Sequence, residues 1–196
     1  GIMFHHFHND KIHKRGQGSI SKNDFYKLIK FLGRKNILNA HEFLLRFKEN
    51  RLKNKNLCLT FDDALRCQYD IAVPVIEDLN IKAFFFIYSS IFSENPDLFE
   101  VYRYFRMNYF KNIDEFYKDF FKVYGKNLNN YFNKKKNIIK KIKQEFPFYS
   151  LNDIRFRLVR DEILNKDEYR KLMLVMFEQK KFNPKEFYNV LFMSKS

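Results

Sequence analysis

The sequence predicts an α/β fold in its first half, followed by an all-helical block. Residues 57–61 and 83–88 are apolar runs of strand length, and a helical pattern separates them. From about Ser93 onward, strand patterns disappear and helical patterns repeat. With 196 residues, of which 45% are hydrophobic, the chain can bury the core of one domain with a large insertion. We therefore predict an α/β portion over residues 1–92 and a helical insertion or C-terminal extension over residues 93–196.

The first predicted strand covers residues 2–7, within a stretch that contains closely spaced histidines. Because side chains alternate along a strand, His6 and His8 share one face and His5 takes the other. His6 and His8 can therefore approach one ligand, and we predict that they bind substrate. The alternative is a structural role at the strand end.

Two helices are predicted before the central strand. Residues 21–24 resemble a capping box, the apolar residues that follow lie on one helical face, and Gly33 suits a helix end. Asn39 opens a second helix in the same way, with Phe43 and Phe47 facing inward. Both helices precede the residues that carry the candidate chemistry.

The central strand, residues 57–61, runs directly into two adjacent carboxylates, Asp62 and Asp63. Ligands of α/β folds collect at the carboxyl ends of strands, so the pair is predicted to lie at the mouth of a site. Neighbouring carboxylates repel each other unless a cation or a shared proton intervenes. One interpretation is a divalent metal held by one aspartate, with the other free as a base. The alternative is a strand end where one aspartate caps the next turn and the other faces water.

Pro74 limits the helix that follows, because proline suits the first turn of a helix and not its interior. We predict a helix from about residues 71–73 to Asn80, with residues 64–70 as a loop at the mouth of the site. Residues 83–88 are continuously apolar, which predicts a strand buried on both faces in a parallel sheet. Strand, helix and strand together form a right-handed βαβ unit.

The helical block contains a basic segment, residues 134–143, in which isoleucines alternate with lysines. Such a segment can contact phosphates or an anionic membrane surface. The alternative is an amphipathic helix whose charged face is simply solvated. Methionine and aromatic stripes elsewhere in the block predict core packing and not a ligand site.

The net charge of +14 favours an anionic partner, although a lysine-rich composition can also arise without functional meaning. Cys58 and Cys67 are too few to form a disulfide framework. No apolar run has the length of a membrane span, and no signal peptide precedes Met3. We therefore expect a cytoplasmic protein.

Residues 59–64, Leu-Thr-Phe-Asp-Asp-Ala, followed by Ile-Lys-Ala-Phe-Phe-Phe at residues 81–86, resemble the polysaccharide deacetylase (NodB-homology, carbohydrate esterase) family over roughly residues 3–92. The resemblance implies part of a distorted (β/α) barrel. It also implies a metal-dependent hydrolase that removes an N-acyl (acetyl) group from an amino sugar. By the match, Asp62 is the general base and Asp63 is a ligand of a divalent metal, with Zn²⁺ the expected ion.

The chain departs from the family pattern in its histidines. The family's His-x-x-x-His motif lies downstream of the aspartates, whereas all five histidines here precede Asp62 and no two are four residues apart. Ala64 replaces the usual glycine and Phe84 the usual threonine. We therefore expect metal ligands to be missing from this chain, which suggests the N-terminal part of a longer protein, inactive by itself. A substitute arrangement would bring His6 and His8 to Asp63.

Two functions follow from these patterns. The first is the deacetylase, with a carbohydrate as its substrate. The alternative is a catalytically incomplete, deacetylase-like binding module that uses the basic helical block to hold an anionic partner. We expect no nucleic acid partner, but we do consider peripheral contact with an anionic membrane and pairing of chains through the exposed sheet edges of an incomplete barrel.

Overall fold

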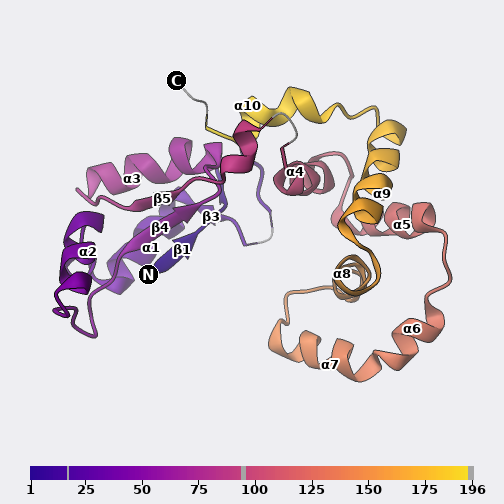
Figure 1. Cartoon of the computed structure of the whole chain (residues 1–196), viewed down its shortest axis with the longest axis horizontal. Helices are drawn as coiled ribbons and strands as arrows, with labels where there is room; N and C mark the ends of the chain where they lie inside the picture. The colour runs from indigo at the N-terminus through magenta and orange to yellow at the C-terminus, as the bar shows by residue number, and fades with distance from the viewer. Residues whose placement is uncertain (17, 94–95, 194–196) are drawn as a thin grey trace. The chain divides into compact units, whose positions relative to one another are not determined.

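We describe the protein from a computed structural model, shown in Figure 1, which describes residues 1–16, 18–93 and 96–193. The chain separates into two compact units, which we treat one at a time. Unit 1 comprises Gly1–Val101 and Lys185–Ser196, and unit 2 comprises Tyr102–Pro184. The predicted division between residues 92 and 93 stays a prediction; the unit boundary lies within a later helix.

Unit 1 is built on a parallel sheet, which confirms the mixed α/β class. Its strands are β1 (Ile2–Phe4), β4 (Leu59–Asp62) and β5 (Phe84–Phe86), with β4 in the centre. The register pairs Ile2 with Leu59 and Thr60 with Phe84. A second, two-stranded parallel sheet joins β2 (Phe7–His8) to β3 (Ile20–Ser21). Within the described residues these strands form open sheets and no closed barrel.

Helices cover the sheet of unit 1 (Figure 1). The N-cap of α1 is Ser21, which accepts a hydrogen bond from the Asp24 backbone, and the helix stops at Gly33 with φ 78°. The predicted start and stop of this helix are therefore confirmed. The remaining elements of unit 1 are η1 (Arg34–Asn36), α2 (Ala40–Lys48), η2 (Gln68–Ala72), α3 (Val73–Asp78), η3 (Ser89–Phe92) and α10 (Tyr188–Leu191), while α1 spans Lys22–Leu32.

The core of unit 1 is aromatic. Phe4, Phe7, Phe25 and Phe61 are buried, and Phe25 lies edge-on to the other three, with ring centroids 5.0, 5.2 and 6.2 Å away. Edge-to-face packing at these distances is favourable beyond the burial of area. This cluster fixes β1 and β4 against α1, and so it fixes the strand end that carries the aspartates.

Several predicted elements differ in the structure. Phe47 of α2, which was predicted to face inward, is 63% exposed. The helix near Pro74 begins earlier than predicted. The π-helical turn η2 precedes it, and in this turn the Val73 N–H donates to the Gln68 carbonyl. The helical hydrogen bonds therefore begin before Pro74, which has no N–H to donate. The first strand does not run through residues 2–7, since it breaks between Phe4 and Phe7. Strand β5 is not buried on both faces: the successive residues Phe85 and Phe86, which point to opposite faces, are 38% and 55% exposed, so neither face is fully covered by the described residues.

Unit 2 is all-helical. Helix α4 (Phe99–Asn108) begins in unit 1 and continues into unit 2. A core of phenylalanines, including Phe105, Phe116, Phe120 and Phe156, is fully buried. The other elements of unit 2 are α5 (Ile113–Tyr124), α6 (Asn129–Lys134), α7 (Lys136–Glu145), α8 (Leu151–Leu158), η4 (Val159–Ile163) and α9 (Lys166–Gln179). The short η5 (Pro184–Phe187) begins at the last residue of unit 2 and continues into unit 1. Over the part of the chain that the structure describes, no helix is both long and apolar enough to cross a bilayer.

Candidate active site

The two aspartates lie where β4 ends. Asp62 is the last residue of the strand, and Asp63 begins the turn, with its N–H donating to the Phe86 carbonyl at 3.0 Å. Asp63 and Ala64 have φ values of 74° and 52°, in the left-handed region that residues with a Cβ rarely adopt. Backbone strain of this kind is typical of functional sites. Ala64 occupies the position where the family resemblance expects glycine.

His5 is the imidazole nearest to both carboxylates. Its Nε2 lies 3.9 Å from Asp62 Oδ2 and 3.8 Å from Asp63 Oδ2. All three side chains are partly exposed, so the group is open to solvent. Alternation along an unbroken strand predicted that His5 faces away from His6 and His8. The strand breaks at this point, and the alternation argument therefore does not apply to residues 5–8.

His6 and His8 have different partners in the structure. His6 Nε2 lies 2.8 Å from Glu100 Oε2, while His8 Nδ1 lies 2.9 Å from Ser19 Oγ. Glu100 is a buried carboxylate in the first turn of α4. Glu100 was not predicted from the sequence, because it lies 94 residues after His6 and only the fold brings the two residues together.

Gln68 is a second residue that the sequence analysis missed. Its side chain is fully buried, and its Nε2 donates to the His5 carbonyl at 2.9 Å and to the Asp62 carbonyl at 2.6 Å. A buried amide that holds two backbone segments fixes the separation of His5 from Asp62. Its only sequence signal is a polar side chain at an otherwise buried helical position.

The two aspartates differ in their surroundings. Burial raises the pKa of Asp63, the negative charge of Glu100 raises it further, and His5 opposes this shift. Asp62 Oδ1 is buried and has no hydrogen-bond partner among the described residues. A buried carboxylate oxygen without a partner costs stability unless a ligand or water completes it. The arrangement thus leaves one acceptor ready for a bound molecule.

The family resemblance implies a divalent metal, so we compared the described side chains with the needs of one. Catalytic zinc sites use three protein ligands at about 2.0–2.3 Å. Among residues 1–16, 18–93 and 96–193, no group of three or more His, Cys, Asp or Glu side chains has this arrangement. The residues described here therefore do not form a complete metal site, and we derive no catalytic step through a metal.

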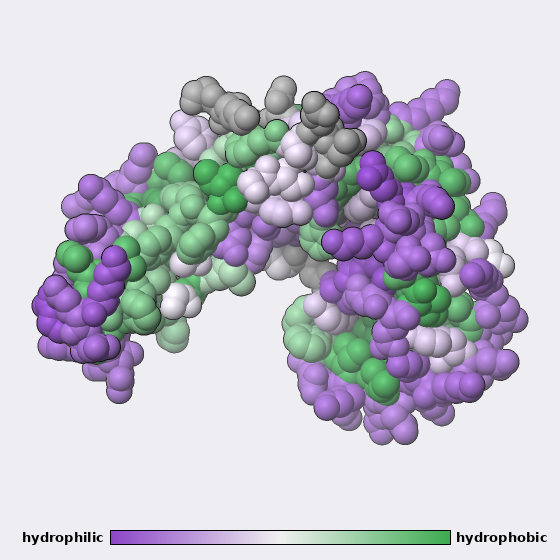
Figure 2. Space-filling model, viewed as in Figure 1, coloured by the Kyte–Doolittle hydropathy of each residue, from purple (hydrophilic) through white to green (hydrophobic). Residues whose placement is uncertain are grey.

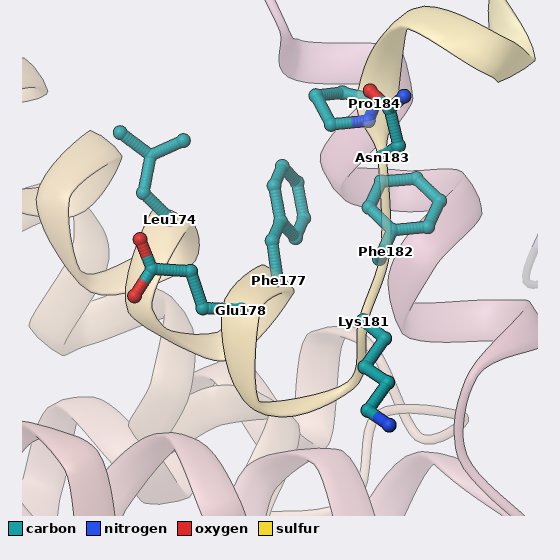
Figure 3. Close-up of a pocket in the computed structure, with 7 residues that line it drawn as sticks. All are labelled: Leu174, Phe177, Glu178, Lys181, Phe182, Asn183 and Pro184. Carbon is teal, nitrogen blue, oxygen red and sulfur yellow. The ribbon is translucent and has the colours of Figure 1, made fainter.

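A pocket of about 370 Å³ also occurs in unit 2, as Figure 3 shows. The rings of Phe177 and Phe182 lie side by side in it, with centroids 4.6 Å apart. Its lining consists of Leu174, Phe177, Glu178, Lys181, Phe182, Asn183 and Pro184. The pocket lining contains one carboxylate and one amine but no histidine, so it has no carboxylate–imidazole pair, and the strand end in unit 1 is the better candidate for catalysis.

Comparison with known proteins assigns this strand end to a family. The sequence profile described as polysaccharide deacetylase matches residues 49–150, which include Asp62 and Asp63. The chain belongs to the polysaccharide deacetylase family. This family consists of carbohydrate esterases and deacetylases, which are hydrolases and are commonly metal-dependent. The match ends well beyond residue 92, so it also includes much of the helical block.

A search of solved structures found similarity to a de-N-acetylase from Aggregatibacter actinomycetemcomitans, described in a study of the structure and mechanism of that enzyme. The TM-score is 0.37 and the sequence identity is 21%. The alignment covers 46% of this chain and 37% of the other, so this chain corresponds to well under half of that protein. A search of curated proteins found no match.

Proposed function

We propose that this chain supplies the catalytic base and one metal ligand of a metal-dependent hydrolase that removes an N-acyl group, usually acetyl, from an amino sugar of a polysaccharide or surface glycan, and that the chain by itself is inactive. The observation that carries the proposal is the Asp62–Asp63 pair at the carboxyl end of β4, where the strained turn of Asp63 and Ala64 begins, inside the region that matches the family. Two further residues support it. His5 places its imidazole beside both carboxylates, and the buried Gln68 holds the backbone of His5.

In this proposal Asp62 acts as the general base. Its partnerless oxygen takes a proton from a water molecule, whose oxygen then attacks the amide carbon of the substrate. The carbon–nitrogen bond breaks, the acyl group leaves as a carboxylic acid, and the nitrogen leaves as an amine once it gains a proton. In this proposal the donor of that proton is His5, the imidazole beside the base, with its Nε2 3.9 Å from Asp62 Oδ2.

The finer parts of the family pattern belong to the same proposal. Asp63 is a ligand of a divalent metal, with Zn²⁺ the first candidate, and the remaining ligands come from outside the described residues. The open sheet of unit 1 is then part of a distorted (β/α) barrel. His6 and His8 face the substrate only if their bonds to Glu100 and Ser19 rearrange. The cytoplasm remains the proposed location.

The substrate class can be tested through binding by the full chain. N-acetylated chito-oligosaccharide is titrated into the purified protein, with its de-N-acetylated counterpart as the comparison, and binding is followed by NMR of the acetyl methyl groups. We expect the N-acetylated form to bind and Asp62→Ala to weaken binding. Asp167→Asn, at an exposed aspartate of α9, is the matched control. Equal binding by Asp62→Ala and the wild type would remove the site from the proposal.

The incomplete metal site has a separate test. Calorimetric titration with Zn²⁺ is expected to show weak binding, and the full chain is expected to release no acetate. Tight binding of one Zn²⁺ that is lost in Asp63→Ala would show that the chain holds its own metal. Acetate release by the chain that depends on Asp62 would show that the site is catalytically complete.

A further inference from the structure

The helix α7 and the turn after it form an exposed surface in which lysines surround apolar side chains. We call it the α7 surface. Figure 2 shows hydrophobic surface over α7 with hydrophilic surface around it. Its members are the exposed residues Lys134, Lys136, Ile138, Lys140, Lys141, Lys143, Phe146, Phe148 and Leu151. This surface takes no part in the proposed hydrolysis.

The apolar part of the α7 surface is a fixed aromatic turn. Phe148 is 68% exposed at its tip, and its ring lies 4.7 Å from that of Tyr149. Lys143 Nζ donates to the carbonyls of Pro147 at 2.7 Å and Tyr149 at 2.5 Å, which closes the turn. The Arg157 guanidinium lies over the Tyr149 ring, 4.3 Å from the ring centre. The turn therefore presents Phe148 to solvent in a preorganised position, which lowers the cost of binding.

The charged part of the surface is almost entirely positive. Residues 134–145 contain six lysines and one acidic residue, Glu145. Lys135 turns to Glu162, which it approaches at 2.5 Å, and does not belong to the surface. Within α7, Lys141 stands three residues after the exposed Ile138, so the two side chains share one side of the helix. Positive charge thus lies beside the apolar residues and not on an opposite face.

The combination of exposed lysines and exposed apolar side chains favours one class of anionic partner over another. A nucleic acid offers phosphates to the lysines and bases that stack on aromatic rings, but it gives Ile138 and Leu151 nothing to bury against. A bilayer with anionic head groups attracts the lysines and also accepts exposed aliphatic and aromatic side chains at the boundary of its acyl chains. We propose that the α7 surface docks the protein on an anionic lipid bilayer.

The test is co-sedimentation of the full chain with lipid vesicles. We expect binding to phosphatidylcholine vesicles that contain phosphatidylglycerol, and binding at least tenfold weaker to phosphatidylcholine alone. Binding to the anionic vesicles should also fall as salt rises, since salt screens exposed charges. No binding to anionic vesicles at low salt, or equal binding to both lipids, would overturn the proposal.

The apolar contribution is tested with Phe148→Ser. Because the ring is 68% exposed, this variant should fold normally, and its affinity for anionic vesicles should fall roughly tenfold from the loss of one inserted aromatic side chain. Phe31→Ser is the control, since it removes an even more exposed ring, 86%, from α1 in unit 1. An equal loss in both variants would contradict a role specific to the α7 surface.

The contribution of the lysines is tested with two triple variants, each of which removes three positive charges. Lys136→Gln/Lys140→Gln/Lys141→Gln removes three charges from the α7 surface, and Lys48→Gln/Lys53→Gln/Lys55→Gln removes three from exposed positions of unit 1. The first variant should lose vesicle binding by at least tenfold, since each lysine near an anionic surface is worth roughly fivefold. The second should lose much less. Tighter binding to single-stranded DNA than to vesicles, unchanged in Phe148→Ser, would assign the surface to nucleic acid and overturn the proposal.

Discussion

Each unit of the molecule contains acidic side chains that are shielded from solvent, Asp153 almost completely and Asp62 and Asp63 in part, and these are satisfied to different degrees. In unit 2, buried Asp153 accepts hydrogen bonds from the Tyr117 hydroxyl at 2.9 Å and from Arg157 Nε at 3.0 Å. In unit 1, the nearest imidazole to Asp62 and Asp63 stands 3.8–3.9 Å away, beyond hydrogen-bond distance. Asp153 therefore stabilises the fold of unit 2. Asp62 and Asp63 are left open to a ligand, which lowers the stability of the protein.

The surroundings of the two sets explain the difference. Burial raises the pKa of Tyr117 and the neighbouring Asp153 raises it further, so the phenol stays protonated and remains a donor. Arg157 supplies the positive charge that a buried carboxylate needs. The charges around Asp63 include Glu100 and Asp62, which oppose its ionisation. The charge of Asp153 is therefore balanced by its neighbours, whereas two carboxylates oppose the ionisation of Asp63.

The largest expected effect is in the core of unit 2. Phe156 is fully buried, with rings of Phe116, Tyr117 and Phe120 at 5.4, 5.4 and 4.9 Å. Phe156→Ala should cost about 3–5 kcal/mol of unfolding free energy, because it leaves a cavity that the helices cannot close. Chemical denaturation measures this, with Phe31→Ala as the exposed control. A loss under about 1 kcal/mol would mean that unit 2 lacks the tight core on which the comparison depends.

The second effect tests the comparison directly. Asp153→Asn keeps the shape of the side chain but removes the charge that Arg157 neutralises. We expect a loss of about 2 kcal/mol, since hydrogen bonds to charged groups are worth more than neutral ones. Thermal denaturation gives the value, and Asp167→Asn, at an exposed position, should change little. A neutral result would show that the Asp153 network adds nothing to the fold.

Local patterns in the sequence predicted much of this structure. Ser21 and Gly33 marked the ends of α1, and the two apolar runs marked β4 and β5. Asp62 and Asp63 were found at the end of β4 because strand residues are followed at once by carboxylates. Each of these signals lies within a few residues of the chain, where spacing and propensity determine the outcome.

The rest depended on contacts between distant segments. Glu100 reaches His6 across 94 residues, and no spacing rule connects them. Gln68, the first residue of η2, holds the backbone of Asp62 and also that of His5, which lies 63 residues earlier in the chain. The exposure of β5 depends on which distant segments cover the faces of the sheet, and a continuously apolar strand gives the same sequence pattern whether or not it is covered.

The third prediction makes the same aspartate-to-asparagine substitution in unit 1, where we expect it to raise the stability of the protein instead of lowering it. Asp63→Asn should stabilise the protein by about 1 kcal/mol or less, because the side chain is 33% exposed and solvent screens part of its charge. A pKa raised in the folded state favours the protonated form. The cost of ionised Asp63 is therefore absent below the unfolded value of 3.8 and develops as pH rises through the folded value.

Thermal denaturation at a series of pH values checks this sign. Wild type and Asp63→Asn should melt together at low pH and separate as pH rises, with the variant more stable near neutrality. A variant that is less stable than the wild type at neutral pH would mean that Asp63 is satisfied like Asp153, and the contrast between the units would fail.

The smallest expected effect concerns the backbone of the same turn. Ala64 is buried at φ 52°, a conformation that costs a residue with a Cβ about 1–2 kcal/mol. Ala64→Gly removes this strain but adds roughly 0.5–1 kcal/mol of unfolded-state entropy, so the net gain should be about 0.5 kcal/mol. Ala72→Gly, in the helical turn of η2, is the same substitution without strain and should instead cost up to about 1 kcal/mol. If chemical denaturation shows both variants equally destabilised, the turn after Asp62 holds no strain, and only its unsatisfied carboxylate distinguishes the site from unit 2.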